Sequence, residues 1–310
     1  MKTQKHSKEI DDFSGLPSWA ETFNFYHHSP SGCQRPDGME FLEKVEARPR
    51  KIFSPPNAPM ISGTQGENHC KRVVIDGDDN YESYRHALSV LEQHQPAPWD
   101  EADKAKHEII LNGEYESVPL EKSGTVFELT LEHLVLGLRE STKGENKVED
   151  GPWISLPMDG LILPFAGEID VKTRGIVEIK TQWPYVKASS KRGWTLNSLP
   201  ARPKPEHVAQ VAVYHAWMLR QANNVPVQIV YANCKDFRVF SSQDCDELQP
   251  ARLDDAVERL RLIAATREKL MSKADDAADL FSMVAPDFDH WMWKSKSPEY
   301  KALAQQVWNQ

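Results

Sequence analysis

The residues with the clearest chemical potential lie in the segment AGEIDVKTRGIVEIKTQ, residues 166–182. Asp170 lies near the end of one short apolar stretch, and Glu178 and Lys180 lie two residues apart in the next. Residues i and i+2 of a strand point to the same face, so Glu178 and Lys180 share a face if this stretch is a strand. A tight turn at residues 173–175 would then bring Asp170 beside Glu178.

Two carboxylates in this position, together with the backbone carbonyl of Ile179, would offer hard oxygen ligands. Mg²⁺ and Mn²⁺ prefer such ligands in proteins. Lys180 would lie beside the ion, where its ammonium group can hold a nucleophilic water or stabilise charge that develops on a phosphate. The alternative is a structural ion pair between Glu178 and Lys180 on a solvated face. The apolar neighbours Ile176, Val177 and Ile179 favour a buried strand, in which charges are usually paired or metal-bound.

The surrounding residues predict the elements that position this segment. Three stretches have the two-residue alternation of strands and are expected to form an antiparallel meander, at 154–163, 166–173 and 175–181. Two more such stretches follow at 226–233 and 237–241. Helical periodicity is found in four segments, at 81–93, 123–140, 206–222 and 251–273. This order predicts an α/β or α+β fold with a central mixed sheet flanked by helices.

A basic loop at residues 183–205 follows the last strand of the meander. Its cations are interleaved with Trp183, Tyr185 and Trp194, and it contains no acid. Cations bind phosphate and aromatic rings stack on bases, so the loop is expected to contact a single-stranded or frayed nucleic-acid end. The alternative is a solvated loop whose charges balance an acidic protein. The basic residues are Lys187, Lys191, Arg192, Arg202 and Lys204, and the expected substrate contacts are Lys191, Arg192 and Trp194.

The order of these motifs resembles that of a known superfamily. G-x-x-D at residues 167–170, followed by VEIKT, resembles the core motif of the PD-(D/E)XK nucleases. Within that superfamily it is most similar to the RecB, lambda-exonuclease and CRISPR spacer-processing branch. Relatives in this branch carry a QxxxY motif on a downstream helix, which Gln210 and Tyr214 match here. The resemblance covers about residues 120–240 and implies a restriction-endonuclease-like core.

The same branch carries an upstream helix with a GTxxH or GTxxE motif, whose acid or histidine approaches the metal. Two segments fit, GTVFE at 124–128 and GTQGE at 63–67. We expect Glu128 to be this acid because it opens a helix just before the strands, and Glu67 is the fallback. The alternative for Glu128 is a first-turn carboxylate that interacts with the helix dipole.

A second register of the acids is also possible. Asp159, Asp170 and Lys172 spell a D…DxK pattern. It ranks below the first register because the hairpin of Asp170 against Glu178 is tighter and matches the GxxD…ExKT order of the family.

The resemblance implies a metal-dependent nuclease that hydrolyses DNA phosphodiester bonds. An exonuclease or end-processing enzyme of recombination, repair or phage DNA metabolism is the leading expectation. The implied ligands of Mg²⁺ or Mn²⁺ are Asp170, Glu178, Ile179 and Glu128. Gln210 and Tyr214 would orient their helix and contact DNA near the cut. The implied partners are DNA with a free end and a recombination protein.

Two other functions stay open: a module that binds nucleic acid without cutting it, and a sequence-specific endonuclease. Some relatives hold an iron–sulfur cluster through one early and three late cysteines. Only Cys234 and Cys245 are late here, so no cluster is expected.

Composition is that of an ordinary globular chain of 310 residues, with 40% hydrophobic and 27% charged residues. The net charge of −9 argues against a protein that coats nucleic acid nonspecifically, but not against a local basic groove. No apolar run is long enough to span a bilayer, and residues 1–13 lack the apolar stretch of a secretory signal. A cytoplasmic protein with no membrane partner is therefore expected.

We expect three regions along the chain. Residues 1–115 are predicted to form a loop-rich and helical accessory region, residues 116–245 the nuclease core, and residues 246–310 a C-terminal helical region.

Overall fold

The computed structural model describes residues 15–23, 25–222 and 225–309. The expected lack of a targeting signal in residues 1–13 falls outside this part of the chain. Its contacts divide the chain into two compact units. Unit 1 comprises Met1–Phe53, Ser155–Ala166 and Glu258–Gln310, and unit 2 comprises Ser54–Ile154 and Gly167–Val257. Every residue expected to bind metal or substrate belongs to unit 2.

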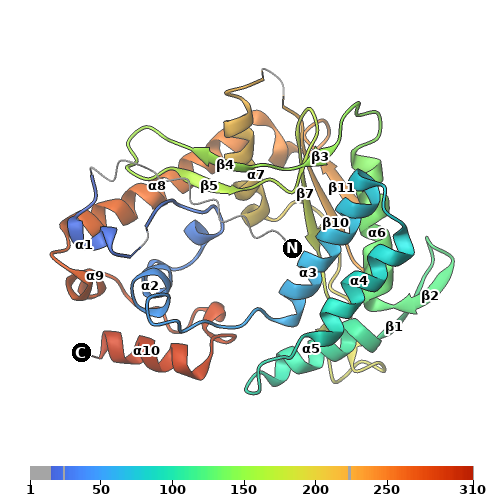
Figure 1. The fold of residues 1–310 in the computed structure, drawn as a ribbon, viewed down its shortest axis with the longest axis horizontal. Coiled ribbons are helices and arrows are strands. Elements are labelled where there is room, and N and C mark those ends of the chain that lie inside the picture. Colours follow the sequence, from blue (N-terminus) through green and yellow to red (C-terminus); the bar gives the residue numbers. More distant parts are fainter. Residues whose placement is uncertain (1–14, 24, 223–224, 310) are drawn as a thin grey trace. The chain divides into compact units, whose positions relative to one another are not determined.

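Unit 2 is built on a five-stranded sheet. Its strands are β3 Glu149–Asp150, β6 Val171–Lys172, β7 Ile176–Thr181, β10 Val227–Ala232 and β11 Phe237–Ser241. They lie in the order β11-β10-β7-β6-β3, with β7 and β10 parallel and the other neighbours antiparallel. The chain therefore has the expected mixed α/β architecture, a central mixed sheet flanked by helices (Figure 1).

The first of the expected strand stretches lies outside this sheet. Residues 154–163 form a strand only at their start, where β4, Trp153–Leu156, pairs with β5, Phe165–Glu168, in a separate two-stranded sheet. A turn from Met158 to Leu161 ends the strand, and Gly160 adopts the left-handed conformation that glycine tolerates. The prediction of a three-stranded meander is therefore wrong, although β6 and β7 do form an antiparallel pair.

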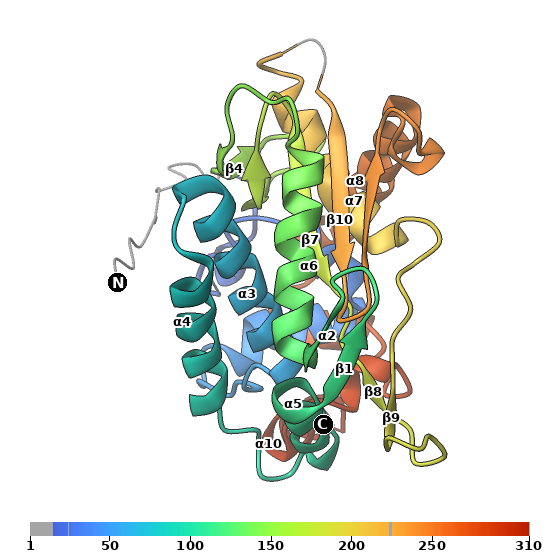
Figure 2. The same cartoon turned by 90° about the vertical axis from the view of Figure 1, so that its right-hand side faces the viewer.

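Helices cover both faces of the five-stranded sheet. α3, Ala58–Lys71, and α6, Val126–Ser141, pack on one face, and α7, Pro205–Met218, packs on the other. Figure 2 shows α6 extending along β7 and β10. Alternation along β7 places Val177 and Ile179 in an apolar cluster with residues of α6. Glu178 and Lys180 therefore point to the face covered by α7.

The start of α6 is set by Thr125, whose side chain accepts a hydrogen bond from the Glu128 backbone N–H at 3.2 Å. The residues before it are extended, because β2, Lys122–Thr125, pairs antiparallel with β1, Glu114–Ser117. Helical periodicity from residue 123 thus places the helix start too early. The competing β-pairing holds residues 122–125 out of the helix.

The helices α4, Asn80–Gln93, and α5, Glu101–Asn112, pack in unit 2 with α3 and α6. The short strands β8, Tyr185–Val186, and β9, Trp194–Thr195, form a hairpin in the basic loop. The limits of the two units do not coincide with the expected domain boundaries at 115/116 and 245/246, since α3, α4 and α5 fall in unit 2 with the sheet.

Unit 1 is largely helical. It contains α1 Ser18–Glu21, α2 Asp37–Phe41, α9 Ala277–Met283, α10 Pro298–Trp308 and most of α8, Pro250–Lys273. Its apolar core includes Met39, Phe41, Leu42, Leu280 and Tyr300. Within the described ranges, no helix combines the length and apolar character needed to cross a membrane.

Candidate functional site

Asp170 and Glu178 lie together inside unit 2. The turn between them is closed by hydrogen bonds between Thr173 and Gly175, from Thr173 N to Gly175 O and from Gly175 N to Thr173 Oγ1, both 3.1 Å. Gly175 leaves no room for a side chain, because a Cβ there would lie 2.0 Å from the carbonyl oxygen of Pro226. The turn returns the chain as β7, and the side chains of Asp170 and Glu178 are 8% and 0% exposed. Two carboxyl groups therefore meet in a nearly dry position.

The backbone of Ile179 faces the same group. Its N–H donates a hydrogen bond to Asp170 Oδ2 at 2.8 Å. The N–H and C=O of one strand residue project to the same edge of the strand. The carbonyl oxygen of Ile179 is therefore directed to the edge on which Asp170 lies, rather than to β10.

Only one of the two carboxylate oxygens of Glu178 has a partner. Its Oε1 forms an ion pair with Lys180 Nζ. Its Oε2 is buried and has no hydrogen-bond partner among the described residues. A buried polar atom without a partner is unfavourable by about 1–3 kcal/mol, and more if it is charged. Glu178 Oε2 is therefore an acceptor that is suited to a ligand.

Glu67 of α3 is the third acid of this group. It interacts electrostatically with Asp170 and Glu178 and forms an ion pair with Lys71, one helical turn away, at 2.6 Å. Lys71 also contacts Asp150 Oδ1 at 2.9 Å. We call Glu67, Asp170, Glu178, Lys71 and Lys180 the acid–lysine cluster.

All three acids of the cluster have raised pKa values. Burial is the largest cause for each, and a neighbouring acid adds to it: Glu178 acts on Asp170, Asp170 on Glu67, and Glu67 on Glu178. Burial and the charge of Glu178 raise the pKa of Asp170 to about 7. Burial alone would lower the pKa of Lys180, but the carboxylates around it outweigh burial and raise it. When all three acids are ionised, the cluster carries three negative charges against two ammonium groups.

These features fit a divalent cation. The cluster offers carboxylate oxygens, one of them unpaired, and a main-chain carbonyl, which are the donors that Mg²⁺ and Mn²⁺ accept. In the described part of the chain, no three His, Cys, Asp or Glu side chains converge closely enough to form a ready-made metal site. Mg²⁺ typically binds through one or two carboxylates and keeps several waters, so it does not require such a cage.

Glu128 lies in a different environment. Its carboxylate pairs with Lys122 at 2.8 Å, and Lys122 also pairs with Glu132 at 2.6 Å. Its backbone N–H is capped by Thr125, so T-V-F-E forms the first half of a capping box at the start of α6. The structure thus brings Glu67, and not Glu128, to the acid–lysine cluster. Both segments open with GTxxE, and only packing distinguishes them.

Gln210 and Tyr214 lie on α7 and face the sheet. Gln210 Nε2 donates to the Tyr214 hydroxyl at 3.1 Å. A Cβ on Gly167 would lie 2.9 Å from that hydroxyl, so Tyr214 lies directly against the first residue of the GxxD segment. Burial raises the pKa of Tyr214, and the charges of Glu178 and Asp170 add to this effect. Both motif residues are therefore close to the cluster.

The basic loop separates into exposed and buried parts. Lys191 and Arg192 are exposed, and the Arg192 guanidinium lies 5.2 Å from the ring centre of Tyr115 and 5.7 Å from that of Trp194. Trp194 is only 7% exposed and belongs to an apolar cluster with Trp183. Its expected role as a stacking platform for a base is therefore corrected: the ring is a core residue with almost no free face.

In the second register, Asp159–Asp170–Lys172, the lysine is paired with a different acid. Lys172 pairs with Glu149 across β6 and β3 at 3.4 Å, and Asp159 is exposed in unit 1. The cluster built on Asp170, Glu178 and Lys180 is the better-formed arrangement.

Several residues near the cluster have no clear signal in the sequence. Lys71 is marked only by its four-residue spacing from Glu67, which places both on one face of a helix. Lys204 belongs to the basic loop, but Gln182 and Tyr231 carry no motif. Tyr231 could be found only from strand pairing, because it lies opposite Lys180 in the parallel register of β10 and β7.

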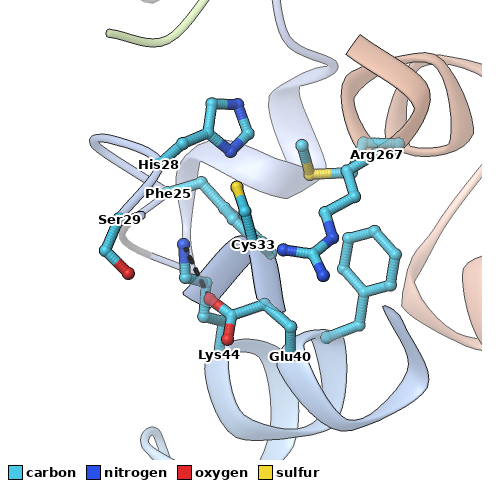
Figure 3. Close-up of a pocket in the computed structure, with 9 residues that line it drawn as sticks. Phe25, His28, Ser29, Cys33, Glu40, Lys44 and Arg267 are labelled. Atoms are coloured by element: carbon cyan, nitrogen blue, oxygen red, sulfur yellow. Dashed lines mark ion pairs between the residues drawn. The ribbon is translucent and has the colours of Figure 1, made fainter. Parts of the chain in front are cut away.

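A separate polar cluster lies in unit 1 (Figure 3). Lys44 and Glu40 pair at 3.4 Å beside a cavity of about 10 Å³. Each nitrogen of the Arg267 guanidinium donates a hydrogen bond, to Asp37 Oδ1 at 2.7 Å, Gly32 O at 3.0 Å and Arg35 O at 2.7 Å. Charges paired in this way hold the N-terminal segment to α8 and leave little room for a ligand.

Comparisons with known proteins identify no family. No protein-family model matches the sequence, and no curated protein matches it. Among solved structures, the crystal structure of SSO0001 is similar at 16% sequence identity and a TM-score of 0.26, covering 81% of this chain and 94% of that chain. A TM-score this low carries no argument about fold or function.

Proposed function

We propose that this protein is a metal-dependent nuclease of the PD-(D/E)XK type, with a restriction-endonuclease-like core in unit 2. The observation that carries the proposal is the acid–lysine cluster: two buried carboxyl groups, with Asp170 just before β6 and Glu178 on β7, an unpaired Glu178 Oε2, and Lys180 beside them. The adjacent Gln210–Tyr214 pair supports it, because it is the QxxxY motif of the same branch. The cation is Mg²⁺ or Mn²⁺.

Each residue has a role in this proposal. Asp170, Glu178 and the Ile179 carbonyl hold the cation, and Glu67 replaces Glu128 as the acid contributed by an upstream helix. A divalent cation bound there would act as a Lewis acid that polarises the scissile phosphate. Lys180 orients the attacking water and offsets charge on the phosphate.

The neighbouring residues position the cluster and the substrate. Tyr214 and Gln210 hold α7 against the GxxD segment. Lys191 and Arg192 bind DNA phosphates, while Trp194 supports the loop from the core. An exonuclease or end-processing enzyme acting on DNA with a free end is the reading we favour, because the QxxxY motif is a feature of that branch.

The test is incubation of end-labelled linear DNA and closed circular DNA with Mg²⁺, Mn²⁺ or EDTA. Digestion of the linear form alone, abolished by EDTA and by Glu178→Gln, would support an exonuclease. Cutting of the circular form would support an endonuclease instead. Binding without any cleavage in either metal would overturn the proposal in favour of a non-cleaving module.

A further inference from the structure

A set of hydrogen-bonded polar residues lies between the strand position opposite Lys180 and the start of α7. Tyr231 of β10 lies opposite Lys180 in the parallel register and is completely buried. Its hydroxyl contacts His207 Nδ1 at 2.7 Å and the backbone N–H of Lys204 at 3.1 Å. The Lys204 ammonium group donates to Gln182 Oε1 at 3.0 Å. His207 and Lys204 thus lie on the same side of β7 as the catalytic lysine of the proposal.

The hydrogen bonds of Tyr231 determine which nitrogen of His207 carries the proton. A backbone N–H can only donate, so the Lys204 N–H uses the phenolic oxygen as an acceptor. The phenolic proton then has one acceptor within the described residues, His207 Nδ1. If Nδ1 were protonated instead, the buried phenolic proton would have no partner, which is unfavourable.

His207 therefore presents its other nitrogen as a donor. Burial, with the nearby ammonium groups of Lys180 and Lys204, lowers the pKa of His207 to about 3, so the ring is neutral. A neutral ring that accepts at Nδ1 carries its proton at Nε2. Nε2 has no protein partner in the ranges that the structure describes, and His207 is only half-buried.

We propose that the His207 Nε2–H and the Lys204 ammonium group form a subsite for a backbone phosphate that flanks the scissile one. This inference rests on the proposed nuclease function. Lys204 has three N–H donors and uses one on Gln182, so two remain for phosphate. Tyr231 is a positioning residue, because it holds His207 in the tautomer that donates from Nε2.

The two donors of the subsite should differ in their response to salt. Lys204 neutralises a phosphate and releases counterions, whereas the neutral His207 does not. Lys204→Ala is expected to flatten the plot of log affinity against log salt by about 0.7–0.9. His207→Ala is expected to weaken binding about tenfold, the effect of one hydrogen bond to a charged group, with no change in slope.

The experiment measures KM, kcat and salt-dependent binding with a labelled DNA oligonucleotide. His207→Gln keeps an N–H donor near the position of Nε2 and should retain most of the affinity, whereas His207→Asn should behave like His207→Ala. The matched controls are the exposed His86→Ala and Lys143→Ala, which should match the wild type. Equal losses in the Gln and Asn variants, or a KM that His207→Ala leaves unchanged, would overturn the subsite.

A second measurement separates this inference from the proposed function. Nitrogen-15 NMR of the free protein should show His207 as the Nε2–H tautomer, and this preference should be lost in Tyr231→Phe. If the wild type cleaves no DNA, the nuclease proposal fails. Titration with inorganic pyrophosphate then tests the subsite by itself: a shift of the His207 Nε2 signal supports anion binding, and the Nδ1–H tautomer or an unmoved signal overturns it.

Discussion

The hydroxyl of Tyr214 lies so close to Gly167 that a Cβ added to the glycine would be 2.9 Å from it. Gly167 opens the GxxD segment and Tyr214 closes the QxxxY segment, so the two motifs are in direct contact across β5 and α7. The spacing also explains why the position before Glu168 holds no side chain.

Gly167→Ala should therefore disturb the acid–lysine cluster indirectly, by displacing Tyr214. Tyr214 is 3% exposed and has little room to move, so the added methyl group is expected to destabilise the protein by about 1–3 kcal/mol. Tyr214→Phe removes the nearest atom, and the double variant should recover part of the loss. Chemical denaturation of the four proteins measures the coupling. Purely additive effects would contradict the contact.

Glu67 and Glu128 should differ sharply in their effect on cleavage. Glu67→Gln removes an acid from the cluster and is expected to reduce turnover by at least about 10²-fold, the usual scale for one preorganised charged group. Glu128→Gln removes a partly exposed ion pair with Lys122, worth about 1 kcal/mol, and should leave turnover near that of the wild type. Turnover in Mg²⁺ at saturating DNA is the measurement. The reverse ranking would show that Glu128 is the upstream acid.

Lys180→Ala should lower kcat more than it weakens DNA binding. Its ammonium group pairs with Glu178 inside the cluster, where a charge on the transition state has the largest effect. A loss of about 10²–10³ in kcat is expected. Anisotropy with labelled DNA in EDTA measures binding separately. Equal losses in binding and turnover would make Lys180 a general phosphate contact.

The basic loop should respond differently at its exposed and buried positions. Replacing both Lys191 and Arg192 with Ala is expected to flatten the salt dependence of DNA binding by about one to two units in log affinity against log salt. The exposed Arg259→Ala on α8 is the control. An unchanged slope would show that the loop is a solvated surface that does not contact DNA phosphates.

Trp194→Ala should act on stability rather than on binding. The ring is buried in an apolar cluster, so its loss is expected to destabilise unit 2 by about 3–5 kcal/mol. Thermal unfolding of the variant measures this. A fully stable variant that has lost affinity for single-stranded DNA would restore the stacking role.

Unit 1 should lose stability as the pH falls. Burial lowers the pKa of His28 below its ordinary value of 6.5, although the hydrogen bond to Glu268 at 2.9 Å opposes this effect. Below about pH 6.5 the unfolded chain takes up a proton at His28 that the folded protein does not, so the free energy of unfolding decreases. The contribution is fully present above pH 6.5 and is lost as the pH falls from 6.5 towards the lowered pKa.

His28→Gln can keep a hydrogen bond to Glu268 without titrating at this position. It should make the pH dependence of stability shallower by up to about 1.4 kcal/mol per pH unit in this window. Denaturant unfolding of both proteins from about pH 5 to 8 measures the difference, with the exposed His86→Gln as control. Identical pH dependence in His28→Gln and the wild type would show that His28 titrates normally when folded.

Much of the cluster could be predicted from local sequence. Asp170, Glu178 and Lys180 lie within eleven consecutive residues, joined by a turn that Gly175 permits. Local strand geometry therefore places them together with little help from the rest of the fold. Alternation along residues 175–181 also predicts that Glu178 and Lys180 share one face of the strand, since side chains of a strand alternate. The strands 226–233 and 237–241 and the helix of the QxxxY motif follow from the same periodicities.

The tertiary structure decided what periodicity could not. Glu67 and Glu128 have the same local motif, and only the packing of α3 beside β7 brings Glu67 to Asp170. Trp194 belongs to a loop with the composition of a nucleic-acid-binding segment. Its ring nevertheless lies in the core, because α5, α6 and the hairpin β1–β2 provide an apolar surface for it. Tyr231 gains its relation to Lys180 through parallel pairing of strands that are distant in sequence. In each case the deciding free energy comes from contacts between segments that are distant in sequence, and local residue spacing carries no information about such contacts.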